Sequence, residues 1–93
     1  MEFEWDDTKE RSNEQKHGIS FTDAADVFDD PYHIEEDVTR PEHGERRFKA
    51  IGTVGAYVVA VIYTDRGDRR RIISARRAKR NERKQYHQGP ASS

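Results

Sequence analysis

The sequence has 93 residues, with 17 Lys and Arg against 18 Asp and Glu, and a formal net charge of −1. Hydrophobic residues make up only 32% of it, enough for one domain with a thin core. The lack of cysteine excludes a disulfide framework, a thiolate zinc site and cysteine catalysis. The longest apolar run, residues 56–63, is too short to span a membrane, and the acidic N-terminus is unlike a secretory signal. We therefore expect a single soluble, cytoplasmic domain over residues 1–93 that does not associate with membranes.

A short strand and two helices are predicted for the N-terminal part. Residues 3–5 alternate as a brief strand, and a helix over 8–17 follows, with Asp6 or Asp7 as N-cap and Gly18 as the left-handed residue after it. This helix has almost no apolar face, so it must pack on its neighbours through the stems of its Lys and Asn side chains. Ser20 predicts the start of a second helix, whose apolar stripe begins at Phe21 and which Pro31 ends.

The rest of the chain predicts strands and a last helix. Strands are expected over 46–52, 57–64 and 69–75, with a further acidic edge strand over 32–37. A helix is expected over 78–87 and a frayed tail over 88–93. Helices followed by strands indicate an α+β fold: a small antiparallel sheet of three to four strands, with two N-terminal helices on one face and a C-terminal helix. The other face of the sheet is expected to be open.

The near-zero net charge conceals a division along the chain. Residues 1–45 hold 15 acidic and four basic residues, whereas residues 46–93 hold 13 basic and three acidic residues. Arginine supplies ten of those 13 bases, and its planar fork matches phosphate geometry. Two interpretations stay open: the later arginines meet on one surface that faces a polynucleotide, or the two halves neutralise one another through salt bridges.

Several short motifs together resemble the BrnT family, the toxin components of type II toxin–antitoxin systems. The similarity covers residues 3–86 in order and spacing, although no single motif is a catalytic fingerprint. The motifs are Phe3-Glu4-Trp5-Asp6, Asn13, Lys16-His17-Gly18-Ile19-Ser20-Phe21, Val27-Phe28-Asp29-Asp30-Pro31, Gly44-Glu45-Arg46-Arg47, Ile51-Gly52, Tyr63-Thr64-Asp65-Arg66, Arg71-Ile72-Ile73-Ser74-Ala75-Arg76, Glu82-Arg83 and Tyr86. The run Arg69-Arg70-Arg71 is richer in arginine than the family pattern.

The resemblance implies a RelE-like ribonuclease fold and RNA cleavage that inhibits translation. It also implies neutralisation by a BrnA-like antitoxin with a ribbon-helix-helix part, in a complex expected to be 2:2. Contact with DNA would then occur only through the antitoxin.

Metal-free RNA cleavage needs a base for the ribose 2′-OH, cations for the phosphate and an acid for the leaving oxygen. Glu45, Arg47 and Lys49 alternate, so a strand that begins there would point all three to one face. Glu45 is the candidate base, with Arg47 and Lys49 as phosphate ligands; the competing interpretation is a solvated strand face with ion pairs.

Further candidates lie on the later elements. Arg71 and Arg76 are oddly spaced, so Arg76 reaches the same face only if the strand ends or bulges near residues 74–75. We assign Arg76, Tyr63 and Tyr86 to the catalytic group. Either tyrosine could donate a proton or stack on a base; the competing interpretation is that its hydroxyl only anchors core packing. Glu82 and Tyr86 should share one helix face. The predicted RNA-binding residues are Lys49, Arg66, Arg71 and Arg83.

The histidines do not suggest a metal site. His17 is expected to be structural at a helix end, and His33, His43 and His87 are scattered, so no metal is expected. The glycines form no phosphate-binding loop, so no cofactor is expected. Two alternatives to a ribonuclease remain: a non-catalytic module that binds RNA or protein, and a repressor that binds DNA alone, for which no helix-turn-helix spacing is seen.

Overall fold

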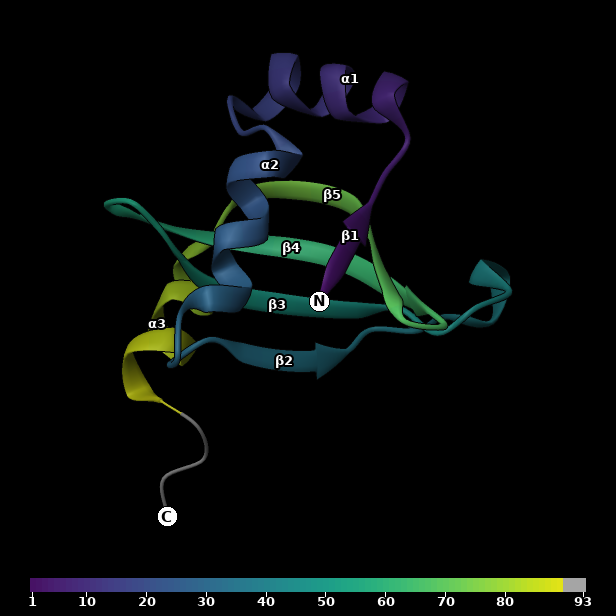
Figure 1. Cartoon of the computed structure of the whole chain (residues 1–93). Helices are drawn as coiled ribbons and strands as arrows, with labels where there is room; N and C mark the ends of the chain where they lie inside the picture. The colour runs from purple at the N-terminus through teal and green to yellow at the C-terminus, as the bar shows by residue number, and fades with distance from the viewer. Residues whose placement is uncertain (90–93) are drawn as a thin grey trace.

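A computed structural model describes residues 1–89, which fold around one five-stranded mixed sheet (Figure 1). The order of strands across the sheet is β1-β5-β4-β3-β2. In chain order the elements are β1 (Glu2–Glu4), α1 (Asp7–His17), α2 (Phe21–Ala24), the 3₁₀ helix η1 (Ala25–Asp29), β2 (Ile34–Asp37), the 3₁₀ helix η2 (Pro41–His43), β3 (Phe48–Val54), β4 (Tyr57–Arg66), β5 (Arg69–Arg77) and α3 (Arg80–Gln88).

The α+β class is confirmed, but two details of the predicted architecture are wrong. The sheet has five strands and is mixed, because β1 pairs in parallel with the start of β5. This contact joins distant parts of the chain, with Glu4 opposite Arg71, and local sequence carries no signal for it. The second helix is only one α-helical turn, which continues as η1. Gln88, expected in the tail, ends α3, and the rest of that expected tail (90–93) lies outside the described residues.

Helix α1 is attached to the sheet by a polar side chain, as its lack of an apolar face requires. Its N-cap is Asp6, and Gly18 after it has a φ of 73°, both as predicted. Asn13 is buried, and its amide accepts a hydrogen bond from the backbone N–H of Ala75 (3.1 Å) and donates one to the carbonyl of the same residue (2.8 Å). The side chain thus takes the place of a neighbouring strand beyond the end of β1.

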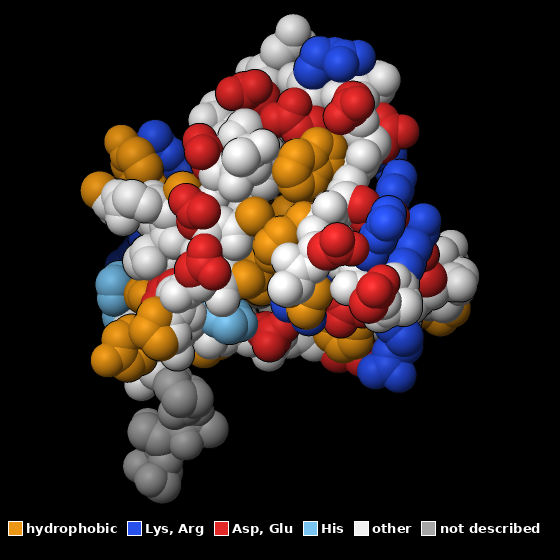
Figure 2. Space-filling model, in the orientation of Figure 1, with side chains coloured by type: hydrophobic (Ala, Val, Ile, Leu, Met, Phe, Trp, Pro, Cys, Tyr) orange, Lys and Arg blue, Asp and Glu red, His pale blue; other side chains and the backbone are white. Residues whose placement is uncertain are grey.

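The main core lies between the sheet and α2 with η1. Figure 1 shows α2 and η1 crossing the sheet, and Figure 2 shows acidic side chains gathered over this region, beside an apolar strip between α2 and β1. Phe21 is fully buried, and Phe28 packs partly buried against the same cluster. The backbone of η1 approaches β3 closely at Gly52, where a Cβ atom would lie 2.9 Å from the Val27 side chain. Glycine is therefore required at this position.

The opposite face of the sheet is not entirely open. Ala78 and the partly buried Tyr86 pack on Ile51 and Ala60 and cover one end of this face. The remaining part of the face is lined by side chains of β3, β4 and β5, and it contains the groove described below. No helix within residues 1–89 is long and apolar enough to cross a membrane.

Candidate functional site

A groove of about 350 Å³ lies on the face of the sheet opposite α2. Its polar wall carries four cations, and its floor is formed by apolar strand residues. The lining residues are Val38, Arg40, His43, Arg47, Lys49, Ile62, Ile73, Ser74 and Arg76. No carboxylate is among them, so the groove presents positive charge, which suits an anionic ligand of extended shape.

A buried carboxylate fixes two of these cations. Glu82, in the first turn of α3, is 2% exposed and accepts two hydrogen bonds from Arg76, at 2.7 and 2.9 Å. It also accepts one from Nζ of Lys49 at 2.8 Å and one from the backbone N–H of Lys79 at 2.8 Å. These bonds, those from Arg76 most of all, outweigh burial and hold the pKa of Glu82 far below its ordinary value. The same contact raises the pKa of Arg76, so both groups stay charged.

A β-bulge brings Arg76 to the groove. Ile62 of β4 pairs with Ser74, whereas the next residue, Tyr63, pairs with Ile72, so Ile73 is an additional residue in β5. The bulge reverses the alternation that would otherwise place Arg71 and Arg76 on opposite faces. The condition stated for Arg76 from the sequence is therefore met. Arg71 shares the face but lies outside the groove lining, where it donates to Glu4 at 2.9 Å.

Glu45 lies beside the groove rather than in its lining. It precedes β3, and its carboxylate pairs with Arg47 (3.5 Å) and with Arg66 (3.3 Å). Burial alone would raise the pKa of Glu45, but the two arginines together lower it. The carboxylate is therefore ionised at neutral pH, and a lowered pKa makes it a weaker base. Arg66 is thus an ion-pair partner of Glu45 and does not line the groove.

His43 is a groove residue that the sequence reasoning missed. It ends η2, and its Nδ1 accepts a hydrogen bond from the backbone N–H of Arg40 at 3.1 Å. Because Nδ1 is occupied as an acceptor, Nε2 carries the proton of the neutral ring and is the atom left for a ligand. The only local signal was a turn at residues 41–44, which does not reveal that His43 lines a groove together with Arg47 and Lys49.

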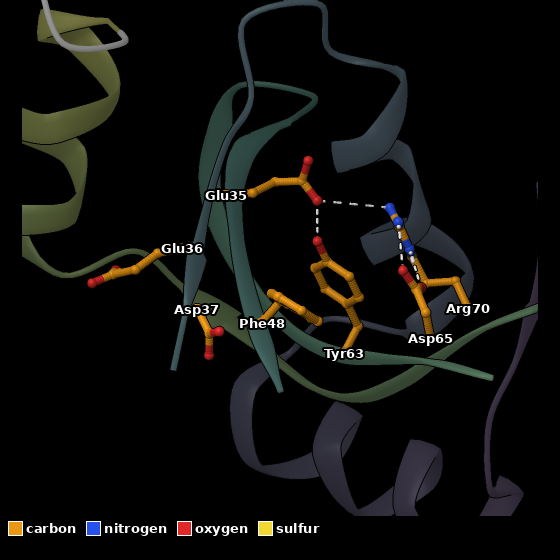
Figure 3. Close-up of a pocket in the computed structure, with 7 residues that line it drawn as sticks. All are labelled: Glu35, Glu36, Asp37, Phe48, Tyr63, Asp65 and Arg70. Atoms are coloured by element: carbon orange, nitrogen blue, oxygen red, sulfur yellow. Dashed lines mark hydrogen bonds and ion pairs between the residues drawn. The ribbon is translucent and has the colours of Figure 1, made fainter. Parts of the chain in front are cut away.

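Tyr63 lies on the other face of the sheet and is not part of the groove. Figure 3 shows it in a second pocket of about 330 Å³, where its hydroxyl donates to Glu35. The guanidinium of Arg70 lies 4.4 Å from the centre of its ring and is held by Asp65 at 2.8 Å. Burial raises the pKa of Tyr63 strongly, and Glu35 adds to this, so the phenol stays protonated. The ring of Tyr63 packs between Phe28 and Phe48.

Tyr86 and Arg83 of α3 are not in the groove either. Tyr86 faces the sheet on the same side of α3 as Glu82, as predicted, and its hydroxyl donates to Oδ2 of Asp30 at 2.6 Å. Burial opposes ionisation of Asp30, but hydrogen bonds from Tyr86, Tyr32 and Thr53 prevail and lower its pKa to about 2. Arg83 is exposed and donates to the carbonyl of Ala78 at 2.8 Å. Tyr86 therefore joins α3 to the segment after η1.

The arginines of the strands do not form one open, uncompensated surface. Arg70 lies on the helix-bearing face, and the other strand arginines named so far all have carboxylate partners. Further ion pairs join Arg69 to Glu2 and Glu4, and Arg46 to Asp37. Of the two interpretations of the divided charge, neutralisation between the halves is correct for much of the sheet. The groove follows the same pattern in part: Arg47, Lys49 and Arg76 have carboxylate partners, but none of those carboxylates lines the groove.

Comparison with known proteins identifies the family. A family described as "Ribonuclease toxin, BrnT, of type II toxin-antitoxin system" matches residues 5–82, which contain every residue that lines the groove. No curated protein matches the chain. Within residues 1–89, no three His, Cys, Asp or Glu side chains come together in a way that could hold a metal ion. Because the match spans most of the chain, the protein belongs to the BrnT family of ribonuclease toxins of type II toxin–antitoxin systems.

Proposed function

We propose that the chain is an endoribonuclease that cleaves RNA in the groove without a metal ion. The ribose 2′-oxygen attacks the adjacent phosphorus and the bond to the 5′-oxygen breaks, which leaves a 2′,3′-cyclic phosphate and a free 5′-hydroxyl. One group takes the proton of the 2′-OH and another supplies a proton to the leaving oxygen. The observation that carries the proposal is the fixed pair Arg76 and Lys49 within a four-cation groove of a ribonuclease-family chain.

The contacts of the groove residues suggest different roles for them. Arg76, Lys49 and Arg47 bind the scissile phosphate and stabilise the charge that develops on it. Glu82 acts as a positioning residue, since it holds two of these cations from behind the groove. His43 presents Nε2 to the substrate.

Two groups compete for the role of base, and a pH–rate profile separates them. Glu45 is ionised but tied to two arginines, whereas His43 lines the groove itself. Imidazoles as a class change charge near neutral pH, so a histidine base gives a rate that rises with pH in that region. A Glu45 base gives a flat profile over that range, because its pKa is lowered. His43→Asn and Glu45→Gln then identify the group whose loss removes the catalysis.

The test of cleavage uses purified protein and end-labelled single-stranded RNA in EDTA. We expect fragments with cyclic phosphate ends, and no cut at a position where the ribose is 2′-deoxy. Arg76→Ala combined with Glu45→Ala should abolish cutting, whereas Arg11→Ala, at an exposed cation of α1, should not change it. Undiminished cutting by the double variant would refute the site, and cutting that requires added Mg²⁺ would refute metal independence.

The partner proposal rests on the family, since a type II toxin acts with an antitoxin. We propose that cleavage inhibits translation, that a BrnA-like antitoxin covers the groove, and that DNA is bound through the antitoxin alone. Expression of the chain should stop protein synthesis in cells, and co-expression of the product of the neighbouring reading frame should restore it. Continued translation at high toxin levels would contradict the proposal.

A non-catalytic RNA-binding module is the second candidate. The observation that favours it is the engagement of Glu45 by two arginines, which leaves that carboxylate a poor base. Under this alternative, the same RNA is bound in a salt-dependent way and recovered at full length.

A further inference from the structure

A group of five cations without carboxylate partners lies just beyond the groove. Among residues 1–89, the charged groups of the strand arginines form ion pairs up to Arg76. No ion pair within those residues involves the five cations that follow. They are Arg77, Lys79, Arg80, Arg83 and Lys84, and all five are exposed. Their charge is therefore available to a ligand, in contrast to that of the strands.

Helix α3 arranges part of this charge as one stripe. Arg80, Arg83 and Lys84 are spaced by three and four residues, and His87 continues the same spacing. Residues so spaced lie on one side of a helix. Glu82 and Tyr86 occupy the side that faces the sheet. We refer to Arg80, Arg83 and Lys84 as the α3 stripe; it faces solvent, away from the helix's own buried contacts.

The α3 stripe begins next to the groove. Glu82, between the stripe residues in sequence, bonds directly to Lys49 and Arg76 of the groove lining. A polyanion bound to Lys49 and Arg76 would therefore lie close to the first turn of α3, which also carries Arg80 and Arg83.

An exposed aromatic ring, that of Tyr57 at the start of β4, lies beside the end of β5 on the helix-bearing side of the sheet, where it lines a pocket with Gly18 and Arg77. Tyr57 is 54% exposed, and the guanidinium of Arg77 lies 3.9 Å from the centre of its ring. Arg77 is three residues before Arg80, a span of at most roughly 11 Å of chain. A large exposed aromatic side chain that is held flat by a cation is a surface on which a nucleobase can stack.

We propose that the α3 stripe and Tyr57 form a second RNA-binding subsite, in which single-stranded nucleotides that flank the scissile phosphate pass from the groove along α3 and around the end of the sheet to Tyr57. The α3 stripe contacts backbone phosphates and Tyr57 stacks against one base. Unpaired bases are required, because bases within a duplex do not expose their faces for stacking. This inference rests on RNA being the ligand of the groove, but it concerns binding and not the chemical step.

Binding is tested with a 12-nucleotide RNA in which every ribose is 2′-O-methylated, because that RNA cannot be cleaved. The triple variant Arg80→Gln, Arg83→Gln and Lys84→Gln should bind at least tenfold more weakly. Its plot of log affinity against log salt should be shallower by about two, since each phosphate contact on a single strand contributes about 0.7. The matched control is Lys9→Gln, Arg11→Gln and Lys16→Gln, three exposed cations of α1; it should bind within twofold of wild type.

Stacking is tested separately at Tyr57. Tyr57→Leu should weaken RNA binding about fivefold, whereas Tyr57→Phe should preserve the affinity. For an RNA that lacks one flanking base, the two variants should have the same affinity. Equal losses in the α1 and α3 triple variants would overturn the inference, as would an unchanged affinity of Tyr57→Leu. Binding of duplex DNA as tight as that of RNA, and independent of Tyr57, would also overturn it.

Cleavage of ordinary RNA by the same proteins keeps the two proposals distinct. If the triple α3 variant raises KM and leaves kcat unchanged, both proposals stand. If wild type cuts RNA but the α3 and Tyr57 variants bind normally, the inference is refuted and the ribonuclease proposal survives. If wild type binds as described but never cuts, the ribonuclease proposal fails and the subsite remains.

Discussion

Replacement of Glu82 by glutamine tests whether one carboxylate holds the groove together. The change keeps the shape of the side chain but removes the negative charge that accepts from Arg76, Lys49 and the N–H of Lys79. Loss of one partner of a buried ion pair costs about 3–5 kcal/mol of unfolding free energy. Arg76 is 29% exposed and Lys49 is 15% exposed, so water compensates both in part. We therefore expect a loss of about 3 kcal/mol at pH 7.

The pH dependence of that loss gives a second, sharper measurement. The pKa of Glu82 is lowered on folding, so its stabilising effect is complete above its ordinary value of 4.5 and declines as the pH falls toward the folded-state pKa. Within that window the contribution falls by about 1.4 kcal/mol per pH unit. The unfolding free energies of wild type and Glu82→Gln, measured with urea, should thus approach one another as the pH is lowered from 4.5 to 3.

The matched control is Glu14→Gln, at an exposed position of α1, which should lie within about 0.5 kcal/mol of wild type at both pH values. A Glu82→Gln protein as stable as this control at pH 7, or a difference from wild type that does not shrink in acid, would refute the role assigned to Glu82.

Three other changes probe the contacts that place the groove. Gly52→Ala should lower the unfolding free energy by about 2 kcal/mol, measured by urea denaturation, because its Cβ would overlap η1. Asn13→Leu should cost about 2 kcal/mol and speed hydrogen exchange at the amide of Ala75, which loses its acceptor. Tyr86→Phe should leave RNA cleavage unchanged; by NMR titration, the pKa of Asp30 should rise from about 2, so the stability that Asp30 contributes should be smaller and should be fully lost at a higher pH.

The local elements were predictable because their signals are local. Asp6, Gly18 and Ser20 mark helix ends through backbone geometry that adjacent residues determine, and the structure uses all three in those roles. The apolar stripe that begins at Phe21 likewise predicted core residues correctly, because Phe21 is buried in the main core. The odd spacing of Arg71 and Arg76 gave a condition, that Arg76 shares the face of Arg71 only if the strand ends or bulges near residues 74–75, and the bulge at Ile73 meets it.

The site was only partly predictable because it depends on register and on long-range contacts. Arg47, Lys49 and Arg76 lie in one groove, but Tyr63 faces the other side of the sheet, a choice set by packing against Phe28 and Phe48. The division of charge along the chain was misleading for the same reason. Whether a given arginine meets a carboxylate depends on which strands pair, and composition does not contain that information.

The two edges of the sheet differ in how readily a further strand can pair with them. The two edge strands are β1 and β2; β1 has only three residues, and beyond it the amide of Asn13 occupies the backbone groups of Ala75 in β5, which leaves β2 as the longer edge among the described strands. A second copy that added antiparallel at β2 would place Glu35, Glu36 and Asp37 against their own counterparts, and like charges so opposed destabilise strand pairing. Growth of the sheet from one molecule to the next through β2 is therefore resisted.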